Sequence, residues 1–184
     1  MMKNENDDVK EVLFSRQQLD EITTEVAEKI DRDYDGREAK LLLVSVLKGS
    51  AVFMADLMRK IKKPMEIDFM KVSSYGSGTK TTGNINIHLD LRRENIEGYD
   101  ILVVEDIVDS GRTLSYLVEY LKMKGAKSVR TCTLLDKPSR REVNFDPDYV
   151  GRQIPDAFVI GYGLDYDEKY RSLPYVGIIK PEAI

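Results

Sequence analysis

The segment from 105 to 113, Glu-Asp-Ile-Val-Asp-Ser-Gly-Arg-Thr, contains the residues of this chain that are best suited to chemistry. Backbone N–H groups at the start of a helix lack partners and attract phosphate. Gly111 lets the backbone approach such an anion closely, and the hydroxyls of Ser110 and Thr113 can donate to the same oxygens. These residue types predict a phosphate site.

Three carboxylates accompany this phosphate site. Asp109 places negative charge at its rim, which is useful if the carboxylate binds Mg²⁺ or moves a proton. Glu105 and Asp106 are adjacent, so on a regular strand they point to opposite faces, and both reach one ligand only if the chain leaves the strand there. The alternative is that Asp109 caps a helix and the other two form a solvated strand end. The concentration of three carboxylates favours function.

The flanking residues predict the elements that position this segment. The apolar run 101–104 predicts a buried strand, and the apolar residues from Leu114 to Leu121 follow at helical spacing. The polar segment is then a strand-to-helix loop, where open α/β sheets bind ligands. A similar unit is predicted from a strand at 41–47, the loop Lys48-Gly49-Ser50 and a helix at 51–61.

The rest of the chain fits the same α/β class. Ser15 and Gln18 form a capping-box pattern before an amphipathic helix that extends to Ile30. Alternation of strands and helices predicts a mainly parallel twisted sheet flanked by helices. We expect a single domain over 1–184, with a core at about 37–137 and a hood formed by the N-terminal segment and about 138–184. Further strands are predicted at 67–72, 85–91, 129–135, 157–160 and 176–179.

Composition limits the classes of function. The net charge is −4 and the pI about 5.2, which argues against a general nucleic-acid binder. The single cysteine, Cys132, cannot form an internal disulfide and suits a reducing compartment. The acidic N-terminal residues are unlike a signal peptide, and the longest apolar run, 41–47, is too short to span a membrane. We therefore expect a cytoplasmic protein without membrane partners.

Residues 103–114 resemble the phosphoribosyl pyrophosphate signature of the type I phosphoribosyltransferases: apolar residues, two acids, two apolar residues, Asp, a small hydroxyl residue, Gly, a variable residue and Thr. A P-loop is excluded, because Asn84 stands where its lysine is required. Across 13–179, further blocks resemble the hypoxanthine-guanine branch of that family in order and spacing. They are 47–50, 74–76, 135–137, and 155–166 with Arg171.

The resemblance implies a fold and a reaction. The fold is that of the type I phosphoribosyltransferases, with a small hood and a flexible lid loop. The reaction transfers the phosphoribosyl group of phosphoribosyl pyrophosphate to N9 of hypoxanthine or guanine, which gives IMP or GMP and pyrophosphate, with Mg²⁺ as cofactor. The family usually forms homodimers or homotetramers. A preference for xanthine is one alternative; another is a phosphoribosyl-pyrophosphate sensor that binds nucleic acid, which the acidic charge opposes.

The resemblance also assigns the residues that hold phosphoribosyl pyrophosphate. Asp109 is the catalytic residue, which exchanges the proton at purine N7. Glu105 and Asp106 bind the ribose hydroxyls or Mg²⁺, and Asp165 is a further metal contact. The set for the phosphoribosyl group is Glu105, Asp106, Asp109, Ser110, Gly111, Arg112 and Thr113. The set for pyrophosphate is Lys48, Gly49 and Arg171, with a cis peptide bond expected between Leu47 and Lys48.

The purine and the lid are assigned in the same way. Lys137 can donate to a 6-oxo group and is badly matched to a 6-amino group. Phe158 stacks on the ring, the Val159 backbone pairs with its edge, and Asp165 completes the purine set. Ser74 and Tyr75 belong to the lid, in a link of 73–84 that is otherwise a loose hairpin loop.

Some of these residues also have a simpler structural interpretation, and some charged residues need no functional one. Lys137 is otherwise a surface lysine, and Phe158 a core aromatic. Arg140 and Arg141 are predicted to form a solvated turn, and His88 receives no role.

Overall fold

The structure is a computed structural model, and it describes residues 5–74 and 85–184. Its helices are α1 (Arg16–Tyr34), α2 (Ala51–Met58) and α3 (Arg112–Met123), with short 3₁₀ turns η1 (Glu5–Asp8), η2 (Pro138–Arg140) and η3 (Pro181–Ala183). Its strands are β1 (Val9–Phe14), β2 (Lys40–Val46), β3 (Met65–Ser74), β4 (Ile85–Leu89), β5 (Tyr99–Val108), β6 (Ser128–Asp136), β7 (Tyr149–Gln153), β8 (Val159–Ile160) and β9 (Val176–Ile179).

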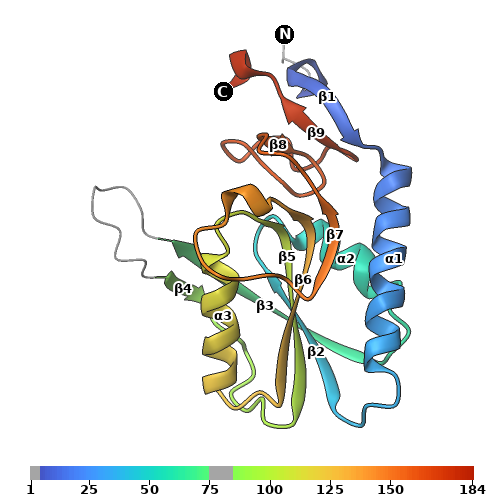
Figure 1. The fold of residues 1–184 in the computed structure, drawn as a ribbon, viewed down its shortest axis with the longest axis vertical. Coiled ribbons are helices and arrows are strands. Elements are labelled where there is room, and N and C mark those ends of the chain that lie inside the picture. Colours follow the sequence, from blue (N-terminus) through green and yellow to red (C-terminus); the bar gives the residue numbers. More distant parts are fainter. Residues whose placement is uncertain (1–4, 75–84) are drawn as a thin grey trace.

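The main sheet has six strands in the order β4-β3-β2-β5-β6-β7, and only β4 runs antiparallel to its neighbour. Helices α1 and α2 cover one face of this sheet and α3 covers the other (Figure 1). Alternate residues of β5 serve the two faces: Leu102 packs with α1 and α2, whereas Ile101 and Val103 pack with α3. The prediction of a mainly parallel sheet between helices is confirmed.

A second, antiparallel sheet has the order β1-β9-β8 and joins the two ends of the chain. It lies above the main sheet in Figure 1. The segment 138–184 is divided between the sheets, because β7 pairs with β6 in the main one. Neither β1 nor β7 was predicted. Lys10 and Glu11 are exposed in β1, and β7 is five residues long and contains Gly151, so neither has a clear apolar alternation.

The start of α1 and the end of β5 can both be compared with the predicted bounds of these elements. The capping box at Ser15 is present, with Gln18 N donating to Ser15 Oγ and Ser15 N donating to Gln18 Oε1. Strand β5 is longer than predicted, since its pairing with β6 continues until Val108 lies opposite Asp136. Glu105 and Asp106 therefore belong to the strand, and the prediction that they lie in the loop is wrong.

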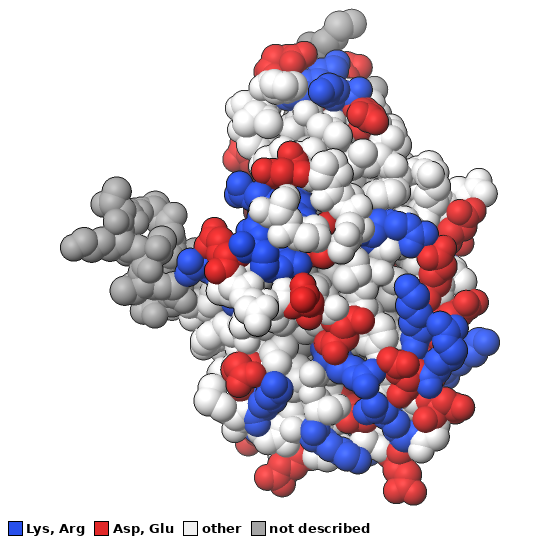
Figure 2. Space-filling model, viewed as in Figure 1, with Lys and Arg blue, Asp and Glu red and all other residues white. Residues whose placement is uncertain are grey.

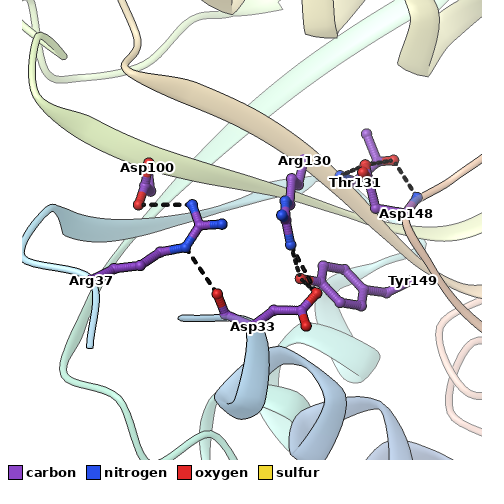
Figure 3. Close-up of polar contacts among 7 residues, drawn as sticks. All are labelled: Asp33, Arg37, Asp100, Arg130, Thr131, Asp148 and Tyr149. Carbon is purple, nitrogen blue, oxygen red and sulfur yellow. Dashed lines mark hydrogen bonds and ion pairs between the residues drawn. The ribbon is translucent and has the colours of Figure 1, made fainter. Parts of the chain in front are cut away.

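The amino ends of the parallel strands are joined by a polar network (Figure 3). Asp33, near the end of α1, accepts hydrogen bonds of 2.8 Å from Arg130 and from the Tyr149 hydroxyl. Arg37 pairs with Asp100 at 3.5 Å, and Asp148 accepts from both the amide and the hydroxyl of Thr131. We call this set of seven residues, the ones drawn in Figure 3, the amino-edge network.

Cys132 is a free thiol inside the core, where burial raises its pKa, so it is inert rather than nucleophilic. Within 5–74 and 85–184, no helix combines the length and the apolar character needed to cross a bilayer.

Candidate active site

The phosphate loop, defined as 109–113, connects β5 to α3. Gly111 is the N-cap of α3 at φ +80°, and no side chain of the described residues caps this helix, so the alternative that Asp109 is its cap is wrong. The amide of Arg112 donates to Ser110 Oγ at 3.3 Å. Every residue of the loop except Arg112 lines, with Glu105, a hollow of about 110 Å³. An uncapped helix start beside a small hollow is suited to an anion.

Arg141 packs beneath the phosphate loop. Its Nη1 donates to the Asp109 carbonyl at 2.8 Å, and its Nη2 forms an ion pair with Asp136. The side chains of this pair are only 13% and 4% exposed. A Cβ on Gly111 would lie 2.8 Å from Arg141 Cδ. Arg141 therefore joins the phosphate loop to the end of β6, and the prediction that it lies in a solvated turn is wrong.

The other two arginines beside the loop form exposed ion pairs. Arg140 Nε lies 3.1 Å from Asp109 Oδ1, and Arg112 Nε lies 2.6 Å from Glu142 Oε2. Figure 2 shows basic side chains gathered in this region, between the small sheet and the main sheet, with acidic ones beside them. The catalytic candidate Asp109 is thus accessible and already faces a cation.

Asp106 is buried and Glu105 is half-buried, and their carboxyls are close enough to affect each other. Burial, together with the charge of Asp106, raises the pKa of Glu105 well above its usual range. Burial also raises the pKa of Asp106. Glu105 Oε2 has no hydrogen-bond partner among the described residues. A group that leaves a buried carboxylate oxygen unsatisfied is a candidate for binding a ligand.

The turn after β2 places Lys48 and Gly49 next to the end of β5. The peptide bond between Leu47 and Lys48 is cis, as predicted. A Cβ on Gly49 would lie 1.6 Å from Asp106 Oδ2, and one on Gly163 would lie 2.1 Å from the Gly49 carbonyl oxygen. This close packing places the turn between the end of β5 and the loop after β8.

Arg171 is fixed by that loop. Its Nη1 donates to the Gly163 carbonyl at 2.8 Å and its Nη2 lies 2.9 Å from Asp165 Oδ1, while Nε is buried without a partner among the described residues. Asp165 Oδ2 accepts from the Glu168 amide at 2.9 Å. Both oxygens of this predicted metal and purine contact are therefore engaged.

Glu168 is a residue of the site that the sequence reasoning missed. Its carboxylate lies 2.8 Å from Lys48 Nζ and 3.5 Å from Arg171 Nη2. Three acids within 165–168, beside an arginine assigned to pyrophosphate, were the available signal.

The predicted purine residues lie at the end of β6 and in β8. Lys137 is 8% exposed, and its Nζ is 3.9 Å from Asp156 Oδ1, so it is not a surface lysine. Phe158 is 46% exposed and meets Tyr166 edge-on at 5.4 Å, so it is not a core aromatic. The Phe158 carbonyl accepts from Ile179, which turns the N–H and C=O of Val159 away from β9.

The predicted lid and the predicted metal ligands are the remaining parts of the site. Ser74 is the last residue of β3, and Tyr75 and the rest of the predicted lid to 84 lie outside the described residues. In the described ranges, no three His, Cys, Asp or Glu side chains form a metal-binding group. Glu105, Asp106 and Asp165 therefore do not make a closed site by themselves.

Residues 11–167 match the phosphoribosyl transferase domain. The hypoxanthine-guanine phosphoribosyltransferase of Bacillus subtilis is 48% identical over 181 residues, which cover 98% of this chain and 97% of the relative.

A crystal structure of a hypoxanthine phosphoribosyltransferase from Staphylococcus aureus superimposes with a TM-score of 0.92 at 45% identity, covering 100% of this chain and 98% of that one. The bifunctional protein TilS/HprT of Listeria monocytogenes is 51% identical over 177 residues, or 96% of this chain. This chain spans only 27% of the length of that bifunctional relative.

Proposed function

The chain belongs to the phosphoribosyl transferase family, and we propose that it is a purine-salvage enzyme that transfers the phosphoribosyl group of phosphoribosyl pyrophosphate to hypoxanthine or guanine. The products are IMP or GMP and pyrophosphate. Near-complete coverage of the hypoxanthine-guanine relative from Bacillus subtilis supports the choice of substrate. We treat the 184 residues as one domain, because β1 leads directly into α1, whose apolar side packs into the core of the main sheet.

The observation that carries this proposal is the convergence of three subsites at the carboxyl edge of the main sheet. The phosphate loop follows β5 and the Lys48-Gly49 turn follows β2, with Asp106 packed against Gly49. Lys137 follows β6, and its amide donates to the Val108 carbonyl at 2.9 Å. A 5′-phosphate, a pyrophosphate and a purine can therefore be held side by side.

In the reaction, the bond between ribose C1′ and pyrophosphate breaks and a bond from C1′ to purine N9 forms. The phosphate loop anchors the 5′-phosphate through its backbone amides and the hydroxyls of Ser110 and Thr113. Lys48, Gly49 and Arg171 stabilise the departing pyrophosphate. Asp109 exchanges the proton at purine N7, which is general acid–base catalysis by an accessible carboxylate.

Purine selection is assigned to three residues. The Lys137 ammonium has three donors and no acceptor, so it matches a 6-oxo group and opposes a 6-amino group. Phe158 offers an accessible ring for stacking. The N–H and C=O of Val159 point away from β9 and can pair with the purine edge.

The residues at the end of β5 suit Mg²⁺. This ion prefers carboxylate and water oxygens and needs only one or two carboxylates when substrate oxygens supply the rest. Glu105 and Asp106 would hold it together, because the regular alternation of β5 between the two faces is broken there and the charge of Asp106 reaches Glu105. Asp106 is buried, and Glu105 Oε2 lacks a partner among the described residues. When bound, the ion neutralises charge on pyrophosphate. Asp165 would join only by giving up its contact with Arg171.

We also propose a homodimer or homotetramer in the cytoplasm. Ile67 and Phe69 on β3 and Leu89 on β4 are exposed apolar residues on one face of the sheet, and a second copy would cover them. The free, buried Cys132 suits a reducing compartment. Light scattering should give a multiple of the 21.0 kDa chain mass, and a monomer would contradict the assembly.

A direct assay tests the function. Purified protein is incubated with phosphoribosyl pyrophosphate and hypoxanthine, guanine, xanthine or adenine, with and without Mg²⁺. We expect Mg²⁺-dependent IMP and GMP formation and little use of adenine. Faster use of xanthine would change the assigned substrate, and no turnover of any 6-oxopurine would overturn the enzyme proposal.

A further inference from the structure

Glu168 lies between the two cationic side chains that the proposed reaction uses for pyrophosphate. One carboxylate oxygen is 2.8 Å from Lys48 Nζ, and the other is 3.5 Å from Arg171 Nη2. The side chain of Glu168 is 65% exposed, so it can leave these contacts without disturbing the core. An internal anion thus bridges the groups that an incoming anion needs.

The loop of 165–171 holds Glu168 in this place. The Glu168 amide donates to Asp165 Oδ2 at 2.9 Å, and the Tyr170 amide donates to Glu5 Oε1 at 3.1 Å. Asp167, Glu168 and Tyr170 all have positive φ values, between 50° and 72°. Left-handed conformations at residues other than glycine persist where surrounding contacts hold them, and they are concentrated at functional sites.

We propose that the Glu168 carboxylate is an internal competitor of pyrophosphate, which sets the affinity of the site for both pyrophosphate and phosphoribosyl pyrophosphate. This inference rests on the proposed function. Glu168 pairs with Lys48 and Arg171 in the free protein and gives up both contacts when a ligand arrives. It is a residue that determines affinity and has no catalytic step of its own.

Electrostatics gives the direction of the effect. Pyrophosphate carries more negative charge than one carboxylate, so it displaces Glu168 but must first break two exposed ion pairs, each of modest strength. The displaced carboxylate then remains close to the ligand and repels it. The pKa of Glu168 is lowered by its hydrogen bond to Lys48, so the group stays ionised at neutral pH. Glu168 therefore weakens pyrophosphate binding and favours its release.

The variant Glu168→Gln tests this inference. Calorimetric titration with magnesium pyrophosphate, without purine, should show binding about 3- to 10-fold tighter than for the wild-type protein. In the assay, the KM for phosphoribosyl pyrophosphate should fall by a similar factor, while the KM for hypoxanthine should not change. The gain should shrink at high salt, because exposed pairs are screened.

Two further variants separate charge from structure. Glu168→Asp keeps the charge and should bind pyrophosphate more weakly than Glu168→Gln. Asp167→Asn is the matched control, since Asp167 is in the same loop but pairs with Lys169, and its affinity for pyrophosphate should equal that of the wild type. An active wild-type enzyme whose Glu168→Gln variant binds pyrophosphate no more tightly overturns this inference and leaves the proposed function intact. A protein inactive on every purine overturns the function.

Discussion

The two ends of the parallel sheet use their charged residues in different ways. At the amino edge, Asp33, Arg130 and Tyr149 are bonded to one another, and Arg37 is bonded to Asp100 (Figure 3). At the carboxyl edge, Glu105 Oε2 and Arg171 Nε are buried without partners among the described residues. The third such atom among the described residues is the Tyr34 hydroxyl, which adjoins Asp33 at the amino edge and is uncharged.

Charged groups at the amino edge therefore mainly stabilise the fold, whereas unpaired groups at the carboxyl edge are available to a ligand. Charges paired within the protein contribute to folding and have no remaining capacity for a ligand. Unpaired buried groups cost stability, and they persist where a ligand or ion completes them. Two of the ion pairs around the proposed subsites, Lys48 with Glu168 and Arg140 with Asp109, involve exposed side chains that a ligand can separate.

The largest effect should come from Asp109→Asn. Loss of a general acid–base group costs about 10²- to 10⁴-fold in kcat. The affinity for phosphoribosyl pyrophosphate and the free energy of unfolding should change little, because the side chain is accessible and its ion pair is with an exposed arginine. Steady-state kinetics and urea unfolding measure these quantities. Unchanged turnover would remove the catalytic assignment.

Asp100→Asn is the matched control, since Asp100 lies near the amino end of the same strand, β5. It pairs with Arg37 and accepts from Ser128 Oγ at 2.5 Å. Its loss should lower the free energy of unfolding by about 1.5–3 kcal/mol, the range for hydrogen bonds to charged groups, and leave kcat unchanged. A fall in kcat of the folded variant would contradict the division between the two edges.

Arg141→Met tests an exception to the division between the two edges, because Arg141 lies at the carboxyl edge but contributes to stability. Removing it leaves Asp136 buried and unpaired, which costs about 3–5 kcal/mol. The double variant Arg141→Met with Asp136→Leu should recover much of this loss, as measured in a double-mutant cycle by urea unfolding. A single-variant loss below about 1 kcal/mol would show that the pair contributes little.

Lys137→Met tests whether a lysine at the carboxyl edge selects the purine, whereas a lysine at the amino edge does not. Loss of a charged hydrogen bond to the 6-oxo group should reduce kcat/KM for hypoxanthine about 10- to 100-fold relative to adenine. Lys127 precedes the same strand, β6, at its amino end and is exposed, so Lys127→Met should keep the wild-type ratio. The two ratios are measured by competition between the purines. An unchanged ranking in Lys137→Met would exclude Lys137 as the purine reader.

The sequence predicted the groups at the carboxyl edge better than the contacts between them. Local patterns were enough for the sheet, the capping box at Ser15 and the phosphate loop, because these depend on neighbours in the chain. Arg141 was assigned to a solvated turn and Glu168 was missed, because their partners Asp109 and Lys48 are distant in sequence. The whole amino-edge network was missed for the same reason.

The end of β5 was also mispredicted for a physical reason. Polar residues usually mark the end of a buried strand, but backbone pairing with β6 continues past Glu105 and Asp106. Register between strands is a tertiary property, and no pattern within one segment encodes it. The consequence is a pair of carboxyls on the strand, one buried and one half-buried, which local reasoning took for a solvated strand end or a loop.

The smallest effect should be the pH dependence that Asp33 contributes at the amino edge. Its hydrogen bond from Tyr149, together with the charge of Arg130, lowers the pKa of Asp33 below its ordinary value of 3.8. A lowered pKa in the folded state adds stability above the unfolded pKa, and this stability is lost as the pH falls through the folded value. Because the group is half exposed, the contribution is below about 1 kcal/mol.

Asp33→Asn should therefore lower the free energy of unfolding slightly at pH 7, and the difference from the wild type should begin to shrink only as the pH falls below about 4, toward the lowered pKa of the folded state. Urea unfolding at pH 7, 5 and 3 measures it. Activity at pH 7 should not change, since the amino-edge network lies at the opposite end of the strands from the three subsites. A difference that is as large at pH 3 as at pH 7 would show that Asp33 acts through packing rather than charge. A loss of activity in the folded variant would show that the two edges are coupled through β6 and β7.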